Sequence, residues 1–288
     1  MSDHEARFRA LLSDIERDLD APMDIASLCR RVHLSPFHFH RQCSAYFGVS
    51  VMTLIRLLRL KRAAWQLAYR QHQSVTAIAL GAGYDSLEGF SRAFSKYFAM
   101  SPSAFRRRPD WQNWAQHHEP LRQLRIKHMY SASEQPLSVV TVNPVMVACL
   151  THQGSPQQLS HSIQAFIRWR QAKGLSPAKS RTFNIFYGDP ATTPPADFRL
   201  DLCCTITEPL AAADQPVVAK TIAGGRYARL RHIGSDETLG SAIAFLYRQW
   251  LPASGYELRE EPLFVERLQF YPEVPETEAV TDIYLPVQ

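Results

Sequence analysis

The chain has 288 residues, of which 45% are hydrophobic and 20% charged, and its formal net charge is +5. This length and composition allow one large domain or two ordinary ones, and they exclude a wholly disordered chain. No apolar run reaches the roughly 20 residues of a membrane helix, and the first residues lack the pattern of an export signal, so we expect a cytoplasmic protein without a membrane partner. Five cysteines without a C-x-x-C pair predict reduced thiols rather than a disulfide framework or a metal site.

The charge is unevenly distributed along the chain. Residues 1–110 contain 16 Lys and Arg against 10 Asp and Glu, a balance of +6, whereas residues 111–288 contain 16 against 17, a balance of −1. Between residues 25 and 108 the count is 13 basic against 2 acidic residues, a balance of +11. An excess of this size predicts a polyanionic partner, because a merely well-solvated surface usually shows mixed signs.

The first hundred residues have the pattern of short amphipathic helices. Apolar spacing predicts a helix over residues 4–19. Each later helix start has a residue that favours the N-cap position, and these residues are Asp24, Ser35, Ser50, Ser74, Ser86 and Ser101. The helix after Ser50 continues to about Tyr69, which makes it about 30 Å long, close to the roughly 34 Å of one DNA turn.

Two segments of this region repeat each other. Residues 28–50 match residues 78–101, and in each copy a short helix, a tight turn and a second helix follow in the order of a helix-turn-helix motif. Gly83 provides the positive φ that such a turn often needs. His33 occupies the matching place in the first copy, where a left-handed histidine is tolerated but less favourable.

The second helix of each copy is predicted to lie in the major groove of double-stranded DNA. Side chains on its outward face are expected to contact base edges, whereas Phe39, Cys43, Phe90 and Phe94 face the core. The predicted base-reading residues are Phe37, His40, Arg41, Leu87, Glu88, Ser91 and Arg92. The predicted phosphate-contacting residues are Arg56, Arg59, Lys61, Arg62, Arg106 and Arg107. The pair His38 and His40 is not a metal motif, because i and i+2 positions lie on nearly opposite sides of a helix.

The second half has the pattern of strands and contains its own repeat. Residues 110–136 have no clear period and are predicted to be a connection that packs in part. Residues 139–150 predict two strands or one bulged strand, broken at Asn143-Pro144. Residues 148–155 match residues 228–235, and a helix and an aromatic strand pair follow in each copy. This pattern predicts two β-α-β-β units, joined edge to edge about a pseudo-twofold axis, with a ligand cleft between the helices.

Residues 8–108 resemble the AraC/XylS family of transcriptional regulators. The matching motifs are Ser35-Pro36-Phe37-His38-Phe39-His40-Arg41, Ala79-Leu80-Gly81-Ala82-Gly83-Tyr84-Asp85-Ser86 and Tyr97-Phe98-Ala99-Met100-Ser101-Pro102. His33 departs from the glycine common in the first turn of this family. The resemblance implies an all-α DNA-binding domain over residues 1–109, with RNA polymerase as a further partner.

Residues 137–288 resemble a GyrI-like effector-binding domain, an α+β module. The matching motifs include His152-Gln153-Gly154, Gly224-Gly225-Arg226-Tyr227-Ala228 and Trp250-Leu251-Pro252. Similar domains hold small hydrophobic, often cationic molecules, commonly above a glutamate and between aromatic walls, which attract cations. Val265 stands where many relatives have that acid, which leaves open whether Glu266 reaches the cleft. The predicted effector-binding residues are Tyr187, Tyr227, Trp250, Glu266 and Tyr271, and the four aromatic ones have a core role as their alternative.

Together these patterns predict a ligand-responsive transcriptional regulator with no cofactor and no enzymatic activity. The alternative is that the second domain is a small-molecule hydrolase or a sequestering module. No compact nucleophile-base motif supports the hydrolase, because Ser155 near His152 is too generic a pair. A third hypothesis is a nucleoid protein without an effector, for which the second domain has no obvious use.

Overall fold

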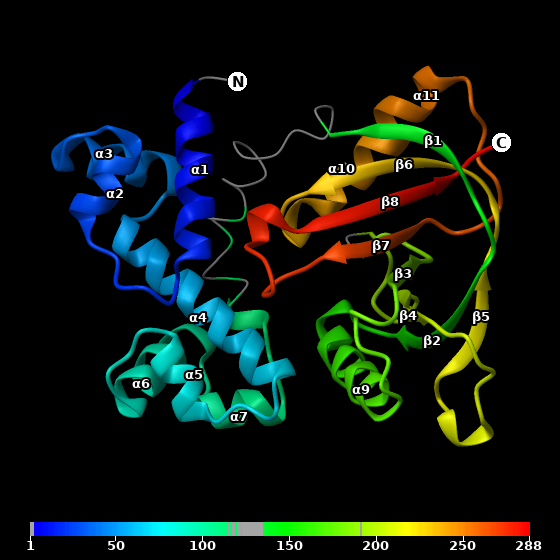
Figure 1. Cartoon of the computed structure of the whole chain (residues 1–288), viewed down its shortest axis with the longest axis horizontal. Helices are drawn as coiled ribbons and strands as arrows, with labels where there is room; N and C mark the ends of the chain where they lie inside the picture. Colours follow the sequence, from blue (N-terminus) through cyan, green and yellow to red (C-terminus); the bar gives the residue numbers. More distant parts are fainter. Residues whose placement is uncertain (1–2, 115, 117–118, 120–121, 123–134, 191) are drawn as a thin grey trace. The chain divides into compact units, whose positions relative to one another are not determined.

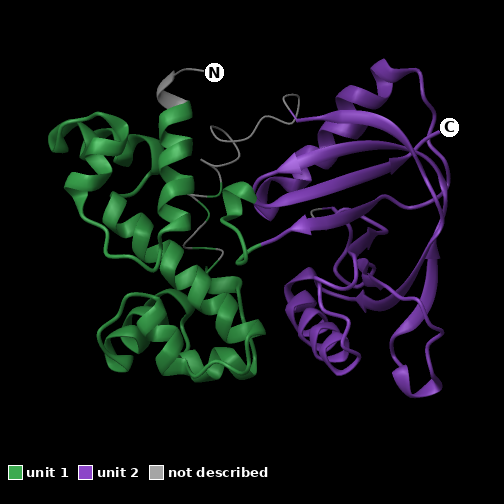
Figure 2. Ribbon diagram, in the orientation of Figure 1, with its two compact units in different colours: residues 1–130, 271–278 green, residues 131–270, 279–288 purple. Residues whose placement is uncertain are grey.

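The computed structural model describes residues 3–114, 116, 119, 122, 135–190 and 192–288. The chain divides into two compact units (Figure 2). Unit 1 comprises residues 1–130 and 271–278, and unit 2 comprises residues 131–270 and 279–288. A short segment late in the chain therefore belongs to the first unit, although the sequence places it inside the second domain.

The described part of unit 1 is helical (Figure 1). Each predicted N-cap is confirmed, because the side chains of Asp24, Ser35, Ser50, Ser74, Ser86 and Ser101 each accept a hydrogen bond from the backbone N–H three residues on. Such a cap contributes about 1 kcal/mol to helix stability. The helices are α1 (Asp3–Arg17), α2 (Ile25–Val32), α3 (Pro36–Phe47), α4 (Val51–Tyr69), α5 (Val75–Gly81), α6 (Leu87–Phe98) and α7 (Pro102–Arg107).

Helix α4 is shared by two separate hydrophobic cores. The first core joins α1, α2, α3 and the N-terminal half of α4, and the second joins the C-terminal half of α4 to α5, α6 and α7. The inward-facing residues Phe39 and Cys43 fill the first core, and Phe90 and Phe94 fill the second, all of them at 0% exposure. Each helix-turn-helix copy is therefore packed on its own end of α4.

The two tight turns also match the sequence prediction. Gly83 has φ +75°, and His33 has φ +56° in the left-handed region. The described start of the predicted connection 110–136 packs on the second core, where Trp114 stacks on Phe98 at 5.0 Å between ring centroids. Residues 115, 117–118, 120–121 and 123–134 of that connection lie outside the described residues.

No single helix among the described residues is long and apolar enough to cross a membrane. Only α3 and α4 taken together, bent at 49°, reach that length and composition. Both helices contribute buried side chains to the cores of unit 1.

Unit 2 is built on one curled antiparallel sheet (Figure 1), with the strand order β1-β6-β8-β7-β3-β4-β2-β5. Helix α9 (Leu159–Ala172) packs against β2 and β4, and α10 (Leu239–Phe245) packs against β6 and is followed by α11 (Leu251–Ser254). The strands are β1 (Leu137–Val142), β2 (Val145–Gln153), β3 (Thr182–Phe186), β4 (Arg199–Thr205), β5 (Val218–Ile222), β6 (Gly225–Ile233), β7 (Phe264–Gln269) and β8 (Val280–Pro286).

The strand order confirms the edge-to-edge junction and adds an exchange that the repeats do not predict. The two copies meet where β3 pairs with β7. Strand β1 precedes the first copy in the chain but pairs with β6 of the second copy, and β5 precedes the second copy but pairs with β2 of the first. Each copy therefore completes its side of the sheet with a strand that adjoins the other copy in sequence.

The sheet has two unlike faces. One face packs on α9 through residues such as Leu150, Leu202 and Cys204. The other carries a buried aromatic cluster that includes Phe183, Phe264 and Tyr284, and also three acids, Asp201, Glu266 and Asp282. Directly paired residues share a face, and the register pairs Phe183 with Glu266 and Glu266 with Asp282. We call this second side the acid face.

Candidate functional sites

The first turns of α3 present the predicted base-reading side chains to solvent. Phe37 is 66% exposed, and His40 and Arg41 are exposed as well. The Arg41 guanidinium lies 5.9 Å from the Phe37 ring centroid. The helix starts at Ser35-Pro36. Phe37, His40 and Arg41 lie at positions i, i+3 and i+4, so they share the outward face while Phe39 is buried on another.

Helix α6 presents a different surface at the equivalent place. Leu87 is 42% exposed, Glu88 and Arg92 are exposed, and Ser91 is half-buried. The first surface is thus aromatic and basic, whereas the second combines one acid with one base. An exposed side chain in the first turns of such a helix can meet a base edge, so the geometry fits the base-reading prediction for both.

Four of the six predicted phosphate-contacting residues have partners inside unit 1. Arg59 donates to the carbonyls of Leu19 and Ala21 at 2.9 and 2.8 Å, and Arg106 donates to the Gln73 carbonyl at 2.7 Å. Burial lowers the pKa of both guanidiniums. These contacts fasten loops to helices, a role that the sequence did not indicate because the acceptors are backbone atoms far along the chain.

The other two residues of this group are paired with acids. Arg62 pairs with Asp20 and donates to the Gly81 carbonyl, and Lys61 pairs with Glu276 at 2.7 Å. Arg56 and Arg107 are exposed. The structure therefore leaves these last two as the best candidates for phosphate contact, while the other four hold unit 1 together.

On the acid face of unit 2, each buried acid is covered by a more exposed basic side chain. Arg181 binds Glu266 with two hydrogen bonds of 2.6 and 2.8 Å, and its guanidinium lies 4.9 Å from the Phe183 ring centroid. The Glu266 side chain is 7% exposed, whereas that of Arg181 is 52% exposed. The hydrogen bond to Glu266 raises the pKa of Arg181. The cation therefore covers a buried carboxylate from the solvent side.

Asp282 lies directly opposite Glu266 in the sheet and has a guanidinium of its own. Arg231 binds it with two hydrogen bonds of 2.8 Å. Like charges directly opposite one another destabilise a sheet, so two neighbouring carboxylates need two cations. The Arg231 side chain is again the exposed partner, at 41% against 3% for Asp282.

Asp201, which is 0% exposed, has the densest set of donors on this face. The Thr151 hydroxyl donates at 2.6 Å, the Tyr187 hydroxyl donates at 2.9 Å, and the Lys220 ammonium completes the set. Burial alone would raise the pKa of Asp201, but these three hydrogen bonds together lower it below its ordinary value. Burial also raises the pKa of Tyr187 to about 12, with the bond to Asp201 as a further cause.

The structure brings three of the five predicted effector-binding residues to the acid face. Tyr187 is 41% exposed there, Glu266 lies under Arg181, and Tyr227 is 1% exposed and donates to the Ala223 carbonyl at 2.7 Å. This face is opposite α9, so these three side chains do not lie between the helices, where the sequence predicts the cleft. The reason is the alternation of side chains along a strand, which places Val265 and Glu266 on opposite faces.

The remaining two residues lie elsewhere. Trp250, at the end of the helical stretch after α10, stacks on Tyr256 at 5.9 Å. Tyr271 belongs to unit 1, where its ring meets Trp65 edge-on at 6.2 Å. The aromatic strand pattern of the repeat placed Tyr271 beside Asp282, but the chain leaves the sheet after β7.

The repeat-equivalent histidines sit at strand ends. His152 Nδ1 lies 2.8 Å from the Ser162 hydroxyl, and its Nε2 lies 3.1 Å from the Ser155 carbonyl oxygen. His232 Nε2 makes the same 3.1 Å contact with the Ser235 carbonyl oxygen, and burial lowers its pKa. The shared contact ties each strand to the turn that follows, as a structural role predicts.

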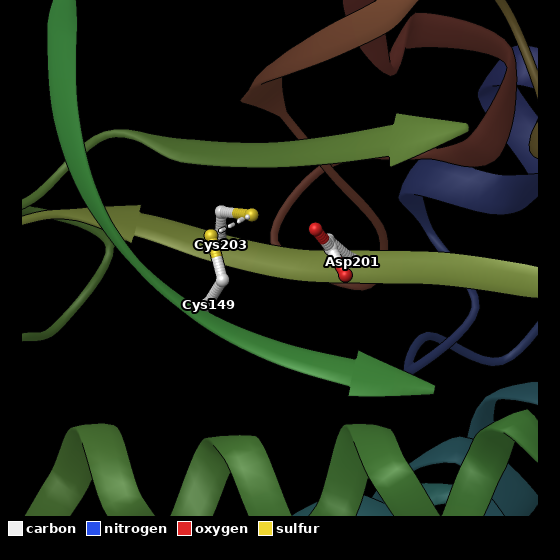
Figure 3. A group of neighbouring side chains, drawn as sticks. All are labelled: Cys149, Asp201 and Cys203. Carbon is white, nitrogen blue, oxygen red and sulfur yellow. Dashed lines mark hydrogen bonds between the residues drawn. The ribbon is translucent and has the colours of Figure 1, made fainter. Parts of the chain in front are cut away.

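Cys149, Asp201 and Cys203 form a compact buried group on the acid face (Figure 3). Their donor atoms lie within 4.8 Å of one another, and the two sulfur atoms are 2.8 Å apart. The group offers three ligand atoms, whereas a structural zinc site has four. The Asp201 oxygens already accept from three protein donors. The donor chemistry therefore does not fit a metal ion.

The two units together define a DNA-binding protein with a small-molecule-binding domain. Residues 28–108 match the model of a helix-turn-helix domain, and residues 135–288 match that of the GyrI-like small molecule binding domain. The chain belongs to the GyrI-like family over that second half, and its first half is a helix-turn-helix domain of the AraC type.

Several bacterial proteins are similar to this chain. The probable transcriptional regulator YgiV of Escherichia coli K12 is 36% identical over 152 residues, which are 52% of this chain and 95% of that protein. The transcriptional regulator Rob of Salmonella typhimurium is 24% identical over 258 residues, 87% of this chain and 86% of that protein. The right origin-binding protein of Escherichia coli K12 is 32% identical over 109 residues, 38% of this chain and 37% of that protein.

Proposed function

We propose that this transcriptional regulator reads DNA through α3 and α6 and senses a small hydrophobic or cationic molecule on the acid face. The observation that carries the first part is the exposure of Arg41 and Arg92 at equivalent places of two helix-turn-helix copies that share α4. In this proposal unit 2 changes promoter binding without catalysis or cofactor, in the cytoplasm and in contact with RNA polymerase.

A mobility-shift assay on the DNA upstream of the protein's own gene tests the base-reading residues. A bidentate arginine–guanine contact contributes about 1–3 kcal/mol, so Arg41→Ala and Arg92→Ala each weaken specific binding by about 5- to 150-fold. Arg248→Ala, an exposed arginine of unit 2, is the matched control and leaves binding unchanged. Specific binding that survives both substitutions excludes this assignment.

Arg56 and Arg107 are proposed to contact phosphates, which predicts a different signature. Arg56→Ala and Arg107→Ala weaken binding to specific and random duplexes alike, and each lowers the salt slope by about one unit. Lys61→Ala gives no such loss of slope, because its ammonium is paired with Glu276. An equal change of slope in all three variants contradicts the distinction drawn from these partners.

On the acid face, Glu266 is proposed to hold the charge of a cationic effector in place of Arg181. The support is the pairing of a buried carboxylate with an exposed guanidinium beside an aromatic ring, a site that suits a hydrophobic cation once the arginine swings out. Tetraphenylphosphonium is a suitable probe for calorimetry. Glu266→Gln is expected to weaken its binding about tenfold and Arg181→Ala to tighten it, whereas Glu260→Gln, an exposed control, has no effect.

One observation favours the alternative of a hydrolase. The Ser162 hydroxyl lies 2.8 Å from His152 Nδ1, and the opposite ring nitrogen contacts a backbone carbonyl that orients it. This is the geometry of a nucleophile and its base. An ester substrate such as p-nitrophenyl acetate tests it, because turnover that disappears in Ser162→Ala would replace the proposal of a non-catalytic domain.

A further inference from the structure

Residues 271–278 connect two strands of unit 2 yet belong to unit 1 (Figure 2). They follow β7, which carries Glu266, and they precede β8, which carries Asp282. Only a few residues therefore separate each end of this segment from a paired acid of the acid face. We call residues 271–278 the strap.

The strap is fastened to α1 by polar contacts. Glu16, which is 8% exposed, accepts hydrogen bonds of 3.0 Å from both the backbone N–H and the hydroxyl of Thr277. The Ser13 hydroxyl donates to Glu278 at 2.6 Å, and Arg17 pairs with the same carboxylate. These bonds lower the pKa of Glu278, with the Ser13 bond as the largest cause.

The strap is also fastened to α4, along much of its length. Glu276 and Lys61 form an ion pair at 2.7 Å, with side chains only 10% and 14% exposed. Nearer the C-terminal end of α4, Arg70 pairs with Glu273 and Trp65 meets the ring of Tyr271. Removing one partner of a buried ion pair leaves an uncompensated charge, so the Glu276–Lys61 contact resists displacement.

Helix α4 is the element that both helix-turn-helix cores share, one core on each half, so a bend in α4 changes the spacing of α3 and α6. The strap is held on α4 and α1 by six of their side chains, and both of its ends continue into strands of the acid face. It therefore links DNA binding and effector binding through the chain itself. A ligand acts on such a link only if it binds one arrangement of the strands more tightly than another.

We propose that the strap transmits changes on the acid face to helix α4, and so to the spacing of the two recognition helices. This inference rests on the proposed function in one respect, namely that the acid face is where the effector binds. The Glu276–Lys61 pair is the central contact, since it is the most buried of the strap's ion pairs with α1 and α4.

Hydrogen exchange on the full chain tests the strap without any ligand. The perturbation is Glu266→Gln, which weakens the Arg181 contact at the start of the link. With an intact strap, this substitution is expected to change the exchange rates of α4 amides at least threefold. In a Glu276→Lys background the same substitution leaves the α4 rates unchanged, and in the double reversal Lys61→Glu with Glu276→Lys the threefold response returns.

Two controls keep the test decisive. Glu260→Lys reverses an exposed charge outside the strap and leaves the response intact, and Glu276→Gln replaces Glu276→Lys if the charge reversal does not fold. A response that is equal in all backgrounds, or absent in the intact chain, overturns the strap. If the unmodified chain fails to bind tetraphenylphosphonium or DNA in separate assays, that result counts against the proposed function and not against the strap. The two failures are therefore distinguishable.

Discussion

Both units are built from duplicated segments, but the copies are joined in different ways. In unit 1 each helix-turn-helix copy has its own core, and the copies share only α4. In unit 2 the copies exchange edge strands and share one sheet. Separate cores let the copies diverge, so α3 presents Phe37 where α6 presents Glu88, although Arg41 and Arg92 occupy equivalent places. The shared sheet instead keeps an equivalent paired acid in each copy, Asp201 and Asp282.

The largest effect is expected from Tyr227→Ala in the shared sheet. The ring is fully enclosed, contacts Phe264 at 5.2 Å between centroids, and carries a hydroxyl bonded to the Ala223 carbonyl. Truncation is expected to lower the free energy of unfolding by about 3–5 kcal/mol. Amide exchange should rise in both copies together, whereas Tyr247→Ala, at a 40% exposed position, changes little. A rise in exchange confined to β6, β7 and β8 would contradict the view that the two copies of unit 2 are stabilised as one sheet.

Phe39→Ala in the first helical core is expected to cost about 3 kcal/mol, at the low end of such truncations. Because the cores are separate, exchange should rise in α1, α2 and α3 while α5, α6 and α7 keep their protection. The matched substitution Phe90→Ala should give the reverse pattern. Equal loss of protection across both cores would show that α4 joins the copies more tightly than their packing suggests.

Asp201→Asn removes the charge of one paired acid and keeps the shape of its side chain, so it measures what the charge contributes to stability. Loss of the charged hydrogen bonds is expected to cost about 2 kcal/mol at pH 7. The pKa of Asp201 is lowered by folding from an ordinary value of 3.8, so its contribution is present above that value. The contribution is lost as the pH falls through the folded-state pKa. Urea unfolding should therefore show the full difference at pH 7, and a shrinking one below pH 3.8.

The smallest effects are expected at the two turns. Gly83→Ala should cost about 1–2 kcal/mol, the penalty of a left-handed conformation for a residue with a Cβ atom. The added Cβ would also lie 2.7 Å from Arg59 Nη1. His33→Gly should stabilise the first copy by less than about 1 kcal/mol, since glycine's own entropy offsets part of the relief. Thermal unfolding checks both variants: the midpoint temperature should fall for Gly83→Ala and rise slightly for His33→Gly.

Local signals made the helices of unit 1 predictable. Ser35 and Ser50 cap their helices through their own side chains, and the bond spans three residues, so the sequence contains the whole interaction. The exposure of Arg41 follows from the same local spacing. The fastening of Arg59 by the Leu19 carbonyl was not predictable, because any backbone carbonyl is an equivalent acceptor until the chain has folded.

Long-range pairings set the limit in unit 2. The repeat identifies β2 and β6 as equivalent, but nothing in it states that β1 joins β6 rather than β2. The position of Glu266 depended on a one-residue register, which decides the face of the sheet. Tyr271 resembled its repeat partner Tyr187 in sequence, yet the chain leaves the sheet there and enters the strap.

The exchange of edge strands has a consequence for the order in which the protein is made. Strand β1 emerges from the ribosome about ninety residues before β6, the partner whose Leu230 lies opposite Leu137. Until then β1 remains an unpaired edge, a segment open to pairing with other chains. The strap is made later still, so the helical unit acquires these contacts to α1 and α4 only after β7 has been made. A nascent chain paused before residue 271 would carry both helix-turn-helix copies without the contact we propose to govern them.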